Sequence, residues 1–252
     1  MTGMSQRTEL IIGDDGVKKL RDASVLLVGC GAVGGYALEG LVRAGIGHIR
    51  VVDHDMFSES NMNRQILATT RTLGRPKVEV ACERAREINP DIDIEGIDTL
   101  VTEETVPMIL DGDFDLVVDA IDTLRNKIAL LEALCDRGIV TFSSMGAALH
   151  VDTQSVRVAL VMKTDTCPLA ASVRKALRGK DTSKITAVYS TETPVTKPSE
   201  RDDHGKSVLG SLPTVPAVFG MNLANEAIKF ILMDKISVNC NIESHKGNGE
   251  DR

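Results

Sequence analysis

The sequence predicts an α/β fold with a Rossmann-like doubly wound, mostly parallel sheet and a more irregular α/β C-terminal portion. Residues 25–28 form a short apolar run, which is typical of a buried parallel strand. Gly29, Gly31 and Gly34 follow in GxGxxG spacing, where a strand should turn tightly into a helix. A second apolar strand, 48–52, then leads to Asp53, an acid placed to bind a ribose hydroxyl.

The other elements follow from apolar periodicity and from Gly and Pro stop signals. Up to Gly146 they alternate regularly: helices ending near Asp22 and at Gly45, a helix from Pro76 to Ile88, a strand at 92–97, a helix at 103–110, a strand at 116–118, a helix at 124–137 and a strand at 139–143. Beyond Gly146 we expect strands at 156–161 and 185–189, helices at 168–177 and 215–233, and a polar, mobile loop at 191–210.

These elements suggest three parts of the chain. Residues 1–150 form the nucleotide-binding Rossmann-like portion, and residues 151–233 complete the same domain on its substrate side. Residues 234–252 form a polar tail that we expect to be disordered.

Composition excludes several classes of protein. The 252 residues are 42% hydrophobic but contain no apolar run long enough to span a bilayer and no signal pattern, so a soluble, cytoplasmic protein without membrane contact is expected. Five scattered cysteines without a CxxC pair argue against a disulfide framework and a four-cysteine zinc site. The net charge of −7 argues against a generally basic surface, although a local basic patch remains compatible with it.

Polar residues gather where the predicted strands end. Asp55, Asn61, Arg64 and Gln65 share one loop after the second strand, and a nicotinamide-binding protein would leave Arg64 and Gln65 unexplained. Ligands of open parallel sheets lie outside the carboxyl ends of the strands. This rule points to ligand binding by the loop.

Two acids, Asp119 and Asp122, follow the strand at 116–118. One of them could merely cap the helix that starts near Thr123, but that explanation does not suit both. Lys77 is expected at the N-terminus of a helix, where the helix dipole disfavours a cation. A bound anion would offset that cost, so we favour a functional Lys77 over a solvated surface lysine.

Basic residues concentrate in one stretch, which contains Lys163, Arg174, Lys175, Arg178, Lys180 and Lys184. This stretch could contact the phosphates of a nucleic acid or could be an ordinary solvated helix face, and the residues alone do not decide between them. Arg7 lies in a leading segment, where composition favours plain exposed surface.

Taken together, these motifs resemble the ubiquitin-activating-like superfamily, of ThiF/MoeB type, whose small bacterial members adenylate a carboxylate or an amide oxygen with ATP. The matching motifs are GCGAVG, VVDHD, SNMNRQ, GRPKVE with INP, and DAID, in order between Arg7 and Gly146.

The resemblance implies a role for each matching residue. Backbone at Gly29, Gly31 and Gly34 would approach the phosphates of ATP, and Asp53 and Asp55 would hold the ribose and neighbouring groups. Asn61, Arg64 and Lys77 would contact the phosphates, with Gln65 beside them, and Asp122 would hold Mg²⁺ and the reacting phosphate. Arg7 would enter the site of the partner subunit of a homodimer. Of these residues, Asn61 and Gln65 would bind the cofactor, and Arg64, Lys77, Asp122 and Arg7 would be catalytic.

The C-terminal half narrows the resemblance. The segments CPLAASVRKALR, VYSTETP and GSLPTVPAVFGM resemble the tRNA threonylcarbamoyladenosine dehydratase branch, which uses ATP to cyclise the threonylcarbamoyl side chain beside the anticodon. This implies tRNA as substrate, with contacts from Arg174, Lys175 and Arg178, and proteins of a sulfur-carrier or cysteine-desulfurase system as candidate partners. Cys167 stands where many relatives carry an acid, and we expect a small, semi-buried side chain there.

Three rival functions remain open. An adenylyltransferase for a ubiquitin-like sulfur-carrier protein is the nearest, but such enzymes usually carry paired CxxC zinc ligands. An NAD-dependent oxidoreductase would not explain Arg64, Gln65 and Lys77. A non-catalytic nucleotide-binding module would not need the full set of phosphate-binding residues.

Overall fold

A computed structural model describes residues 3–196, 200–201 and 207–233 of the chain. Its main feature is a seven-stranded sheet in the order β3-β2-β1-β4-β5-β7-β6. The strands are β1 (Ser24–Val28), β2 (His48–Asp53), β3 (Asp93–Asp98), β4 (Leu116–Asp119), β5 (Thr141–Ser144), β6 (Val156–Leu160) and β7 (Ile185–Ser190). All neighbouring strands pair in parallel except β6, which runs antiparallel to β7 at one edge.

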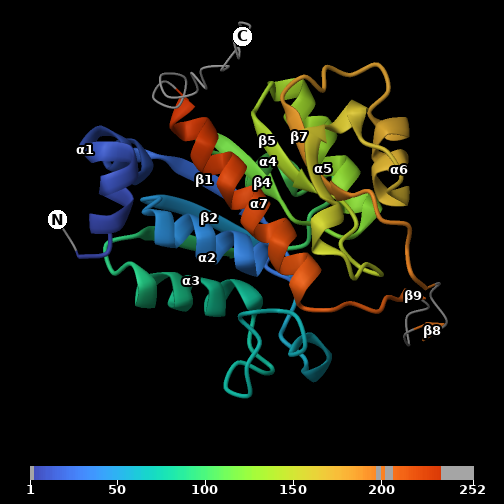
Figure 1. Ribbon diagram of the computed structural model, residues 1–252, viewed down its shortest axis with the longest axis horizontal. Coiled ribbons are helices and arrows are strands. Elements are labelled where there is room, and N and C mark those ends of the chain that lie inside the picture. The colour runs from blue at the N-terminus through green and yellow to red at the C-terminus, as the bar shows by residue number, and fades with distance from the viewer. Residues whose placement is uncertain (1–2, 197–199, 202–206, 234–252) are drawn as a thin grey trace, which may run out of the picture.

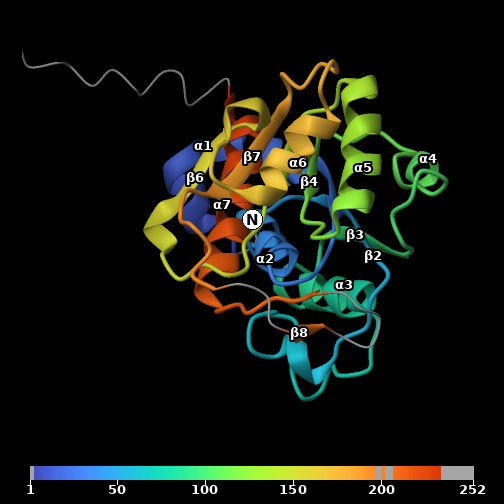
Figure 2. The same cartoon turned by 90° about the vertical axis from the view of Figure 1, so that its right-hand side faces the viewer.

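Helices cover both faces of this sheet (Figures 1 and 2). They are α1 (Gln6–Asp22), α2 (Gly34–Ala44), α3 (Lys77–Ile88), α4 (Val106–Ile109), α5 (Leu124–Arg137), α6 (Pro168–Ala176) and α7 (Thr214–Ile231). One hydrophobic core joins the sheet to α2, α3 and α7, and a second joins the opposite face to α4, α5 and α6. The predicted doubly wound, mostly parallel α/β fold is confirmed.

The two central strands are apolar because both of their faces are covered. Val25 to Val28 and Leu116 to Asp119 are fully buried, as expected for strands inside a parallel sheet. All the parallel strands end at the same edge, so the glycine turn after β1, Asp53 at the end of β2 and Asp119 at the end of β4 are neighbours. The sheet therefore gathers the predicted site residues of three segments at one edge.

Most predicted elements are present within one or two residues, with two corrections. The helix expected at 103–110 is only the four-residue α4, because Thr102 and Thr105 form a polar turn before it: the Thr102 N–H donates to Thr105 Oγ1, which donates to the Leu100 carbonyl at 2.7 Å. Pro76, expected inside the first turn of α3, is instead the residue before it.

The loop predicted at 191–210 contains a short strand pair, β8 (Glu200–Arg201) with β9 (Ser207–Val208). Strands of two residues are too short to leave a periodic pattern in a polar sequence. The base of this segment is tied to Leu149, whose carbonyl accepts the Val195 N–H and whose N–H donates to the Gly210 carbonyl, both at 2.9 Å. Residues 197–199 and 202–206 and the predicted tail, 234–252, lie outside the described residues.

Strands β6 and β7, which come from the predicted substrate-side portion, belong to the same sheet as the strands of residues 1–150. The division at residue 150 stays a prediction. In the part of the chain that the structure describes, no helix combines the length and the apolar character needed to cross a bilayer.

Candidate active site

The glycine turn after β1 forms the floor of the candidate site. Gly29 adopts φ of 95°, and a Cβ there would lie 2.9 Å from the Ala120 carbonyl oxygen. A Cβ on Gly34 would overlap the Gly29 carbonyl oxygen. A Cβ on Gly31, by contrast, would meet nothing nearer than Gln65 Nε2 at 3.9 Å. The fold itself thus requires Gly29 and Gly34, whereas the space above Gly31 is left open.

Asp53 is fixed directly beside this turn. One of its carboxylate oxygens accepts the Cys30 N–H at 2.6 Å and the other accepts the Asp55 N–H at 2.9 Å. Complete burial raises the pKa of the Cys30 thiol well above its usual value. Asp53 is therefore rigidly oriented where a ribose is expected, and Cys30 is a neutral packing residue rather than a nucleophile.

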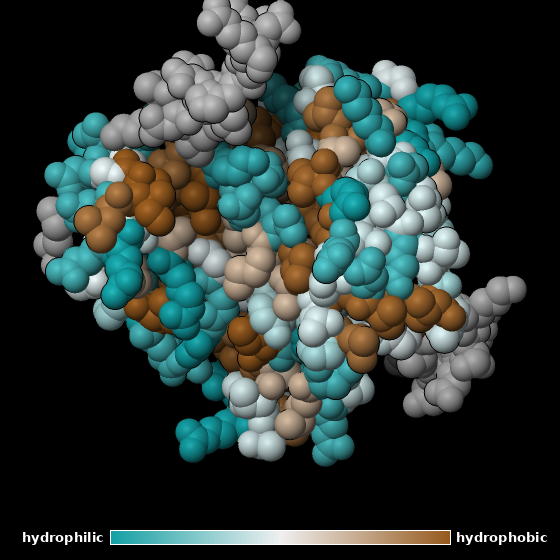
Figure 3. All heavy atoms as spheres, viewed as in Figure 1, coloured by the Kyte–Doolittle hydropathy of each residue, from teal (hydrophilic) through white to brown (hydrophobic). Residues whose placement is uncertain are grey.

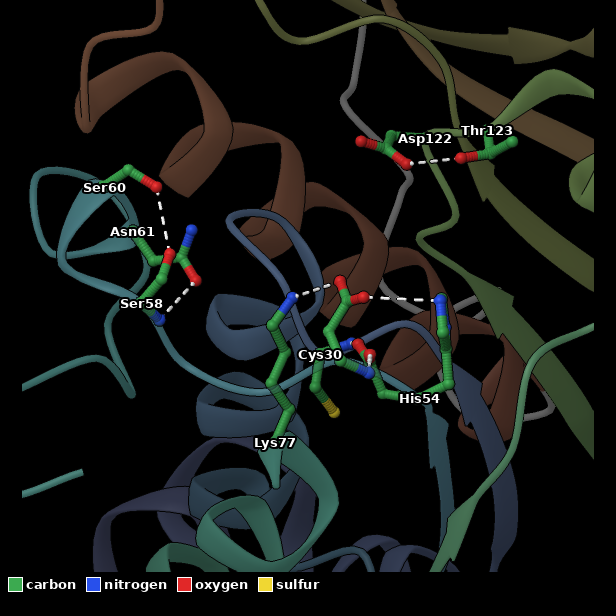
Figure 4. A network of polar contacts seen from close by, with 10 residues as sticks. Cys30, His54, Ser58, Ser60, Asn61, Lys77, Asp122 and Thr123 are labelled. Carbon is green, nitrogen blue, oxygen red and sulfur yellow. Dashed lines mark hydrogen bonds and ion pairs between the residues drawn. The ribbon is translucent and has the colours of Figure 1, made fainter. Parts of the chain in front are cut away.

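Lys77 is a buried cation at the start of α3, as predicted. It is 5% exposed, and its Nζ lies 2.8 Å from Asp55 Oδ2 (Figure 4). The other Asp55 oxygen lies 3.3 Å from His54 Nε2. The anion that offsets the unfavourable helix dipole in this structure is thus the Asp55 carboxylate. Binding of a ligand anion by Lys77 stays a prediction.

The segment from Ser58 to Gln65 forms an arm over the open side of the turn. Asn61 Oδ1 accepts the Ser58 N–H at 3.2 Å, so this predicted ligand residue shapes the arm (Figure 4). The Arg64 guanidinium donates to the Ser60 carbonyl at 2.7 Å and to Asn63 Oδ1 at 2.8 Å. Asn63 in turn donates to the Ser211 carbonyl, and so connects the arm to the chain ahead of α7.

Gln65 combines burial with an unused hydrogen-bonding atom. The side chain is 7% exposed, and its Oε1 has no hydrogen-bond partner among the residues that the structure describes. A buried amide atom without a partner is costly, and it is usually found where water or a ligand completes the bond. Because Gln65 Nε2 borders the open space above Gly31, the amide group fits a polar ligand in that space.

The two acids after β4 have different roles in the structure. Asp119 is fully buried, and one of its oxygens accepts the Ile121 N–H at 3.0 Å. Asp122 is exposed and accepts a hydrogen bond from Thr123 Oγ at 3.1 Å (Figure 4). Thr123 is the residue before α5, and its own side chain makes no capping hydrogen bond to that helix.

Arg7 is not brought to this site within one chain. It is exposed near the start of α1, and Figures 1 and 2 both show α1 apart from the arm. Two large apolar side chains lie shortly after Arg7 in the same helix. They are Leu10 and Ile11, which are 87% and 86% exposed. Figure 3 shows hydrophobic side chains gathered over α1.

The predicted basic stretch is only partly a free surface. The Arg174 guanidinium donates to Thr164 Oγ1 at 2.5 Å, and Lys180 pairs with Asp136 at 2.8 Å. Lys184 donates to the Gly138 carbonyl at 2.6 Å. Lys175 and Arg178, both on or just beyond α6, are exposed. The prediction of nucleic-acid contact is thus best supported for this exposed pair.

Cys167 and the VYSTETP segment have structural roles. Cys167 is buried, more completely than predicted, at the residue before α6. The Glu192 carboxylate of VYSTETP accepts the N–H groups of Val151 and Asp152, both at 3.0 Å through one oxygen. Glu192 thereby fixes the segment that follows β5, near the base of the loop at Leu149.

Sequence reasoning missed the partners of Asp119. Lys127 on α5 and Ser143 on β5 are both fully buried and both bond its carboxylate. A signal for Lys127 was present, since it lies on the same helical face as Leu130, Leu131 and Leu134. His54, beside Asp55, was missed for lack of any pattern around it.

Comparisons with known proteins agree with this geometry. The model of the ThiF family matches residues 5–248. The tRNA threonylcarbamoyladenosine dehydratase of Bacillus subtilis (strain 168) is 34% identical over 239 residues, which cover 90% of this chain and 94% of that protein. The crystal structure of E. coli tRNA N6-threonylcarbamoyladenosine dehydratase, TcdA, in complex with ATP has a TM-score of 0.81 and 32% identity, and covers 92% of this chain and 95% of that one.

A second kind of relative matches a shorter part of the chain. The sulfur carrier protein ThiS adenylyltransferase of Bacillus subtilis (strain 168) is 37% identical over 143 residues, 55% of this chain and 42% of that protein. The match to the family model covers nearly the whole chain, and the Bacillus subtilis dehydratase matches over 94% of its own length. This chain belongs to the ThiF family.

Proposed function

We propose that this protein is an ATP-dependent tRNA threonylcarbamoyladenosine dehydratase, which cyclises the threonylcarbamoyl side chain through an adenylated carboxylate. The observation that carries the proposal is the room for further atoms at Gly31, bordered by the buried Gln65 amide, whose Oε1 has no partner among the described residues. Relatives named for this activity match between 73% and 90% of the chain, and the E. coli enzyme has been crystallised with ATP. A tRNA substrate also supports the cytoplasm as the place of action.

The chemistry required of the site is carboxylate activation. A carboxylate resists attack because oxide is a poor leaving group. When its oxygen attacks the α-phosphorus of ATP, pyrophosphate leaves and an acyl adenylate forms. An internal hydroxyl or amide nitrogen then attacks the acyl carbon, and AMP leaves as the ring closes. In total the nucleoside loses one water, and ATP becomes AMP and pyrophosphate.

The protein would contribute alignment and charge stabilisation. Asp53, held by the Cys30 N–H, is oriented for the ribose, and the backbone at Gly31 can come close to the phosphates. Lys77 is bonded to Asp55, shortly before the arm in the chain, and Arg64 lies on the arm with Asn61 and Gln65. A phosphate chain would compete with Asp55 for Lys77, so we infer that the Lys77 ammonium is shared between them.

We assign Mg²⁺ to Asp122, the acid that the family resemblance places at the metal and the reacting phosphate. Mg²⁺ prefers oxygen ligands and usually binds through one or two carboxylates together with substrate phosphates. Asp53, His54 and Asp55 form one group with ligand atoms within 4.8 Å, but its carboxylates already bond N–H groups, Lys77 and His54. When bound at Asp122, Mg²⁺ would neutralise charge on the reacting phosphate.

We also propose that the working enzyme is a homodimer in which Arg7 enters the partner's site. Leu10 and Ile11 are adjacent, large apolar side chains that are almost fully exposed. Contact with a second copy of the chain would bury them. Proteins of a sulfur-carrier or cysteine-desulfurase system remain candidate partners on the basis of the family alone.

Pyrophosphate exchange tests the proposed function. The purified protein is incubated with ATP, Mg²⁺ and labelled pyrophosphate, with threonylcarbamoylated tRNA, with a sulfur-carrier protein, or with neither. We expect exchange with the modified tRNA, and a loss of roughly 100-fold or more in folded Asp122→Ala and Arg64→Ala variants. Exchange that depends on the carrier protein would replace this function with that of a sulfur-carrier adenylyltransferase.

A further inference from the structure

Lys127 is one of the largest side chains among the fully buried residues that the structure describes. It extends from the first turn of α5 toward the sheet and forms an ion pair with Asp119, which is also fully buried. Two charges removed from water cost several kcal/mol each, and a hydrophobic pair of similar size is often at least as stable. Fold stability alone is therefore a weak reason for this pair, and a further role should be visible in its contacts.

The ion pair belongs to a network that uses both oxygens of Asp119. Oδ2 accepts hydrogen bonds from the Lys127 ammonium and, at 2.6 Å, from Ser143 Oγ, and the ammonium lies 3.3 Å from Ser143 Oγ. Ser143 is available because β4 and β5 pair Asp119 with Ser143 directly. Oδ1 accepts the Ile121 N–H at 3.0 Å. Lys127 and Ser143 thus orient the carboxylate that holds the following turn.

That turn connects the network to the candidate active site. It begins at Ala120, whose N–H donates to the Val28 carbonyl at 2.8 Å and whose own carbonyl packs against Gly29. It ends at Asp122, the exposed acid at the same edge of the sheet. Only Ala120 and Ile121 therefore separate the buried carboxylate of Asp119 from the exposed one of Asp122, and the N–H of Ile121 is held by Asp119.

We propose that Lys127, Asp119 and Ser143 are positioning residues that hold the turn 120–122, and through it Asp122, in the geometry of the adenylation step. This inference rests on the proposed function, because it assumes that Asp122 acts on the reacting phosphate. None of the three residues needs to touch ATP. Their effect should be on the rate of the chemical step and on its dependence on Mg²⁺, with little effect on binding of the nucleotide.

Two double variants distinguish an effect on the position of the turn 120–122 from a general effect on packing of the core. Asp119→Asn/Lys127→Met and Asp119→Leu/Lys127→Met both remove the buried ion pair, and Asn and Leu are close in size. The Asn side chain keeps a carbonyl oxygen for the Ile121 N–H, whereas Leu has no acceptor. The tRNA-dependent exchange rate is measured against ATP and against Mg²⁺, after both variants are shown to be folded by circular dichroism and thermal melting.

We expect kcat of the Leu variant to be at least tenfold below that of the Asn variant. The Mg²⁺ concentration for half-maximal rate should also rise in the Leu variant, while the KM values for ATP agree within about twofold. Equal kcat values and equal Mg²⁺ dependence in the two variants would overturn the proposal. If the Leu variant does not fold, Ser143→Ala takes its place, and it should lower kcat severalfold at an unchanged KM for ATP. An unchanged kcat in Ser143→Ala would then overturn the proposal.

Asp122→Asn serves as the reference variant in this experiment. If Asp122→Asn exchanges pyrophosphate as fast as the wild type, the assumed role of Asp122 is wrong, and the proposed site fails with it. If Asp122→Asn is impaired but the two double variants do not differ, the site stands and the positioning role is wrong. The two failures therefore give different results.

Discussion

At the scale of single residues, the glycine turn separates what the fold needs from what a ligand needs. Gly29 and Gly34 have backbone neighbours where a Cβ would be, so their identity follows from packing. Gly31 has ordinary free space at the same position. The GxGxxG pattern does not reveal this difference, because all three glycines look alike in the sequence.

A Gly31→Ala substitution tests this distinction. The methyl group should be accommodated in the free protein, so the melting temperature should stay within a few degrees of the wild type. It would occupy the space that a phosphate needs, so affinity for ATP should fall roughly tenfold or more, measured by calorimetry. Gly34→Ala is the matched control: its Cβ would overlap the Gly29 carbonyl, so it should lower the melting temperature itself. Unchanged ATP affinity in folded Gly31→Ala would show that the phosphates lie elsewhere.

Buried polar residues mark the limit of residue-scale prediction. Asp53, Arg64, Lys77 and Asp122 could be singled out because they follow strands or break a local rule. Lys127 could not be assigned a role from its position alone, because lysine on a helix is solvated far more often than buried. Its partner Asp119 comes from a strand, so the pair depends on tertiary structure that local patterns do not encode.

At the scale of elements, α6 and the residues just beyond it carry two exposed cations of the basic stretch, Lys175 and Arg178. Arg174 is occupied with Thr164, whereas Lys175 and Arg178 have solvent-exposed side chains. The sequence alone does not distinguish the paired cations from the unpaired ones, because composition does not show which side chains have partners within the folded chain. We therefore expect Lys175 and Arg178, rather than Arg174, to contact tRNA phosphates first.

Charge reversal in α6 tests this assignment. We expect Lys175→Glu/Arg178→Glu to weaken tRNA binding and to reduce the slope of log affinity against log salt by roughly 2, since each phosphate contact contributes about 0.9. Affinity for ATP should stay the same. Lys18→Glu/Arg21→Glu, which changes the net charge equally at two exposed residues of α1, is the matched control. Equal slopes for the two double variants would place the tRNA on another surface.

Predicted boundaries of elements were reliable where apolar periodicity was strong. The helix expected at 124–137 is found with the same ends, because its Leu face and Gly138, which adopts φ of 63°, are both visible in the sequence. The helix expected at 103–110 is only four residues long in the structure (α4), because threonine side chains compete with the helix for backbone groups. The β8 and β9 strands were missed because their pairing is too short to produce a pattern.

At the scale of the whole molecule, assembly should complete the site. Arg7 lies away from the arm within one chain, and the apolar residues beside it are highly exposed. Arg7→Ala and Asp122→Ala subunits, each inactive alone, should regain part of the activity when mixed, because one of the two sites in a heterodimer then has both residues. Differently tagged subunits and tandem purification would verify the heterodimers. If verified heterodimers stay inactive, Arg7 does not act across the interface.

The overall fold was predictable from the sequence, and the choice of substrate was predictable only through family resemblance. The alternation of apolar runs, glycines and amphipathic helices determines a doubly wound sheet, and the carboxyl edge of such a sheet identifies the site. Nothing in the nucleotide-binding residues distinguishes a tRNA from a carrier protein. That choice rests on the C-terminal segments and on relatives that match nearly the whole chain.

The chemical product tests the central claim most directly. The purified protein is incubated with ATP, Mg²⁺ and tRNA carrying threonylcarbamoyladenosine, with the Asp122→Ala variant as control. The tRNA is then digested to nucleosides and analysed by mass spectrometry. We predict that the modified nucleoside loses the mass of one water, that AMP forms in equal amount, and that the control leaves the nucleoside intact. An unchanged nucleoside, together with adenylation of the terminal glycine of a sulfur-carrier protein, would contradict the dehydratase function.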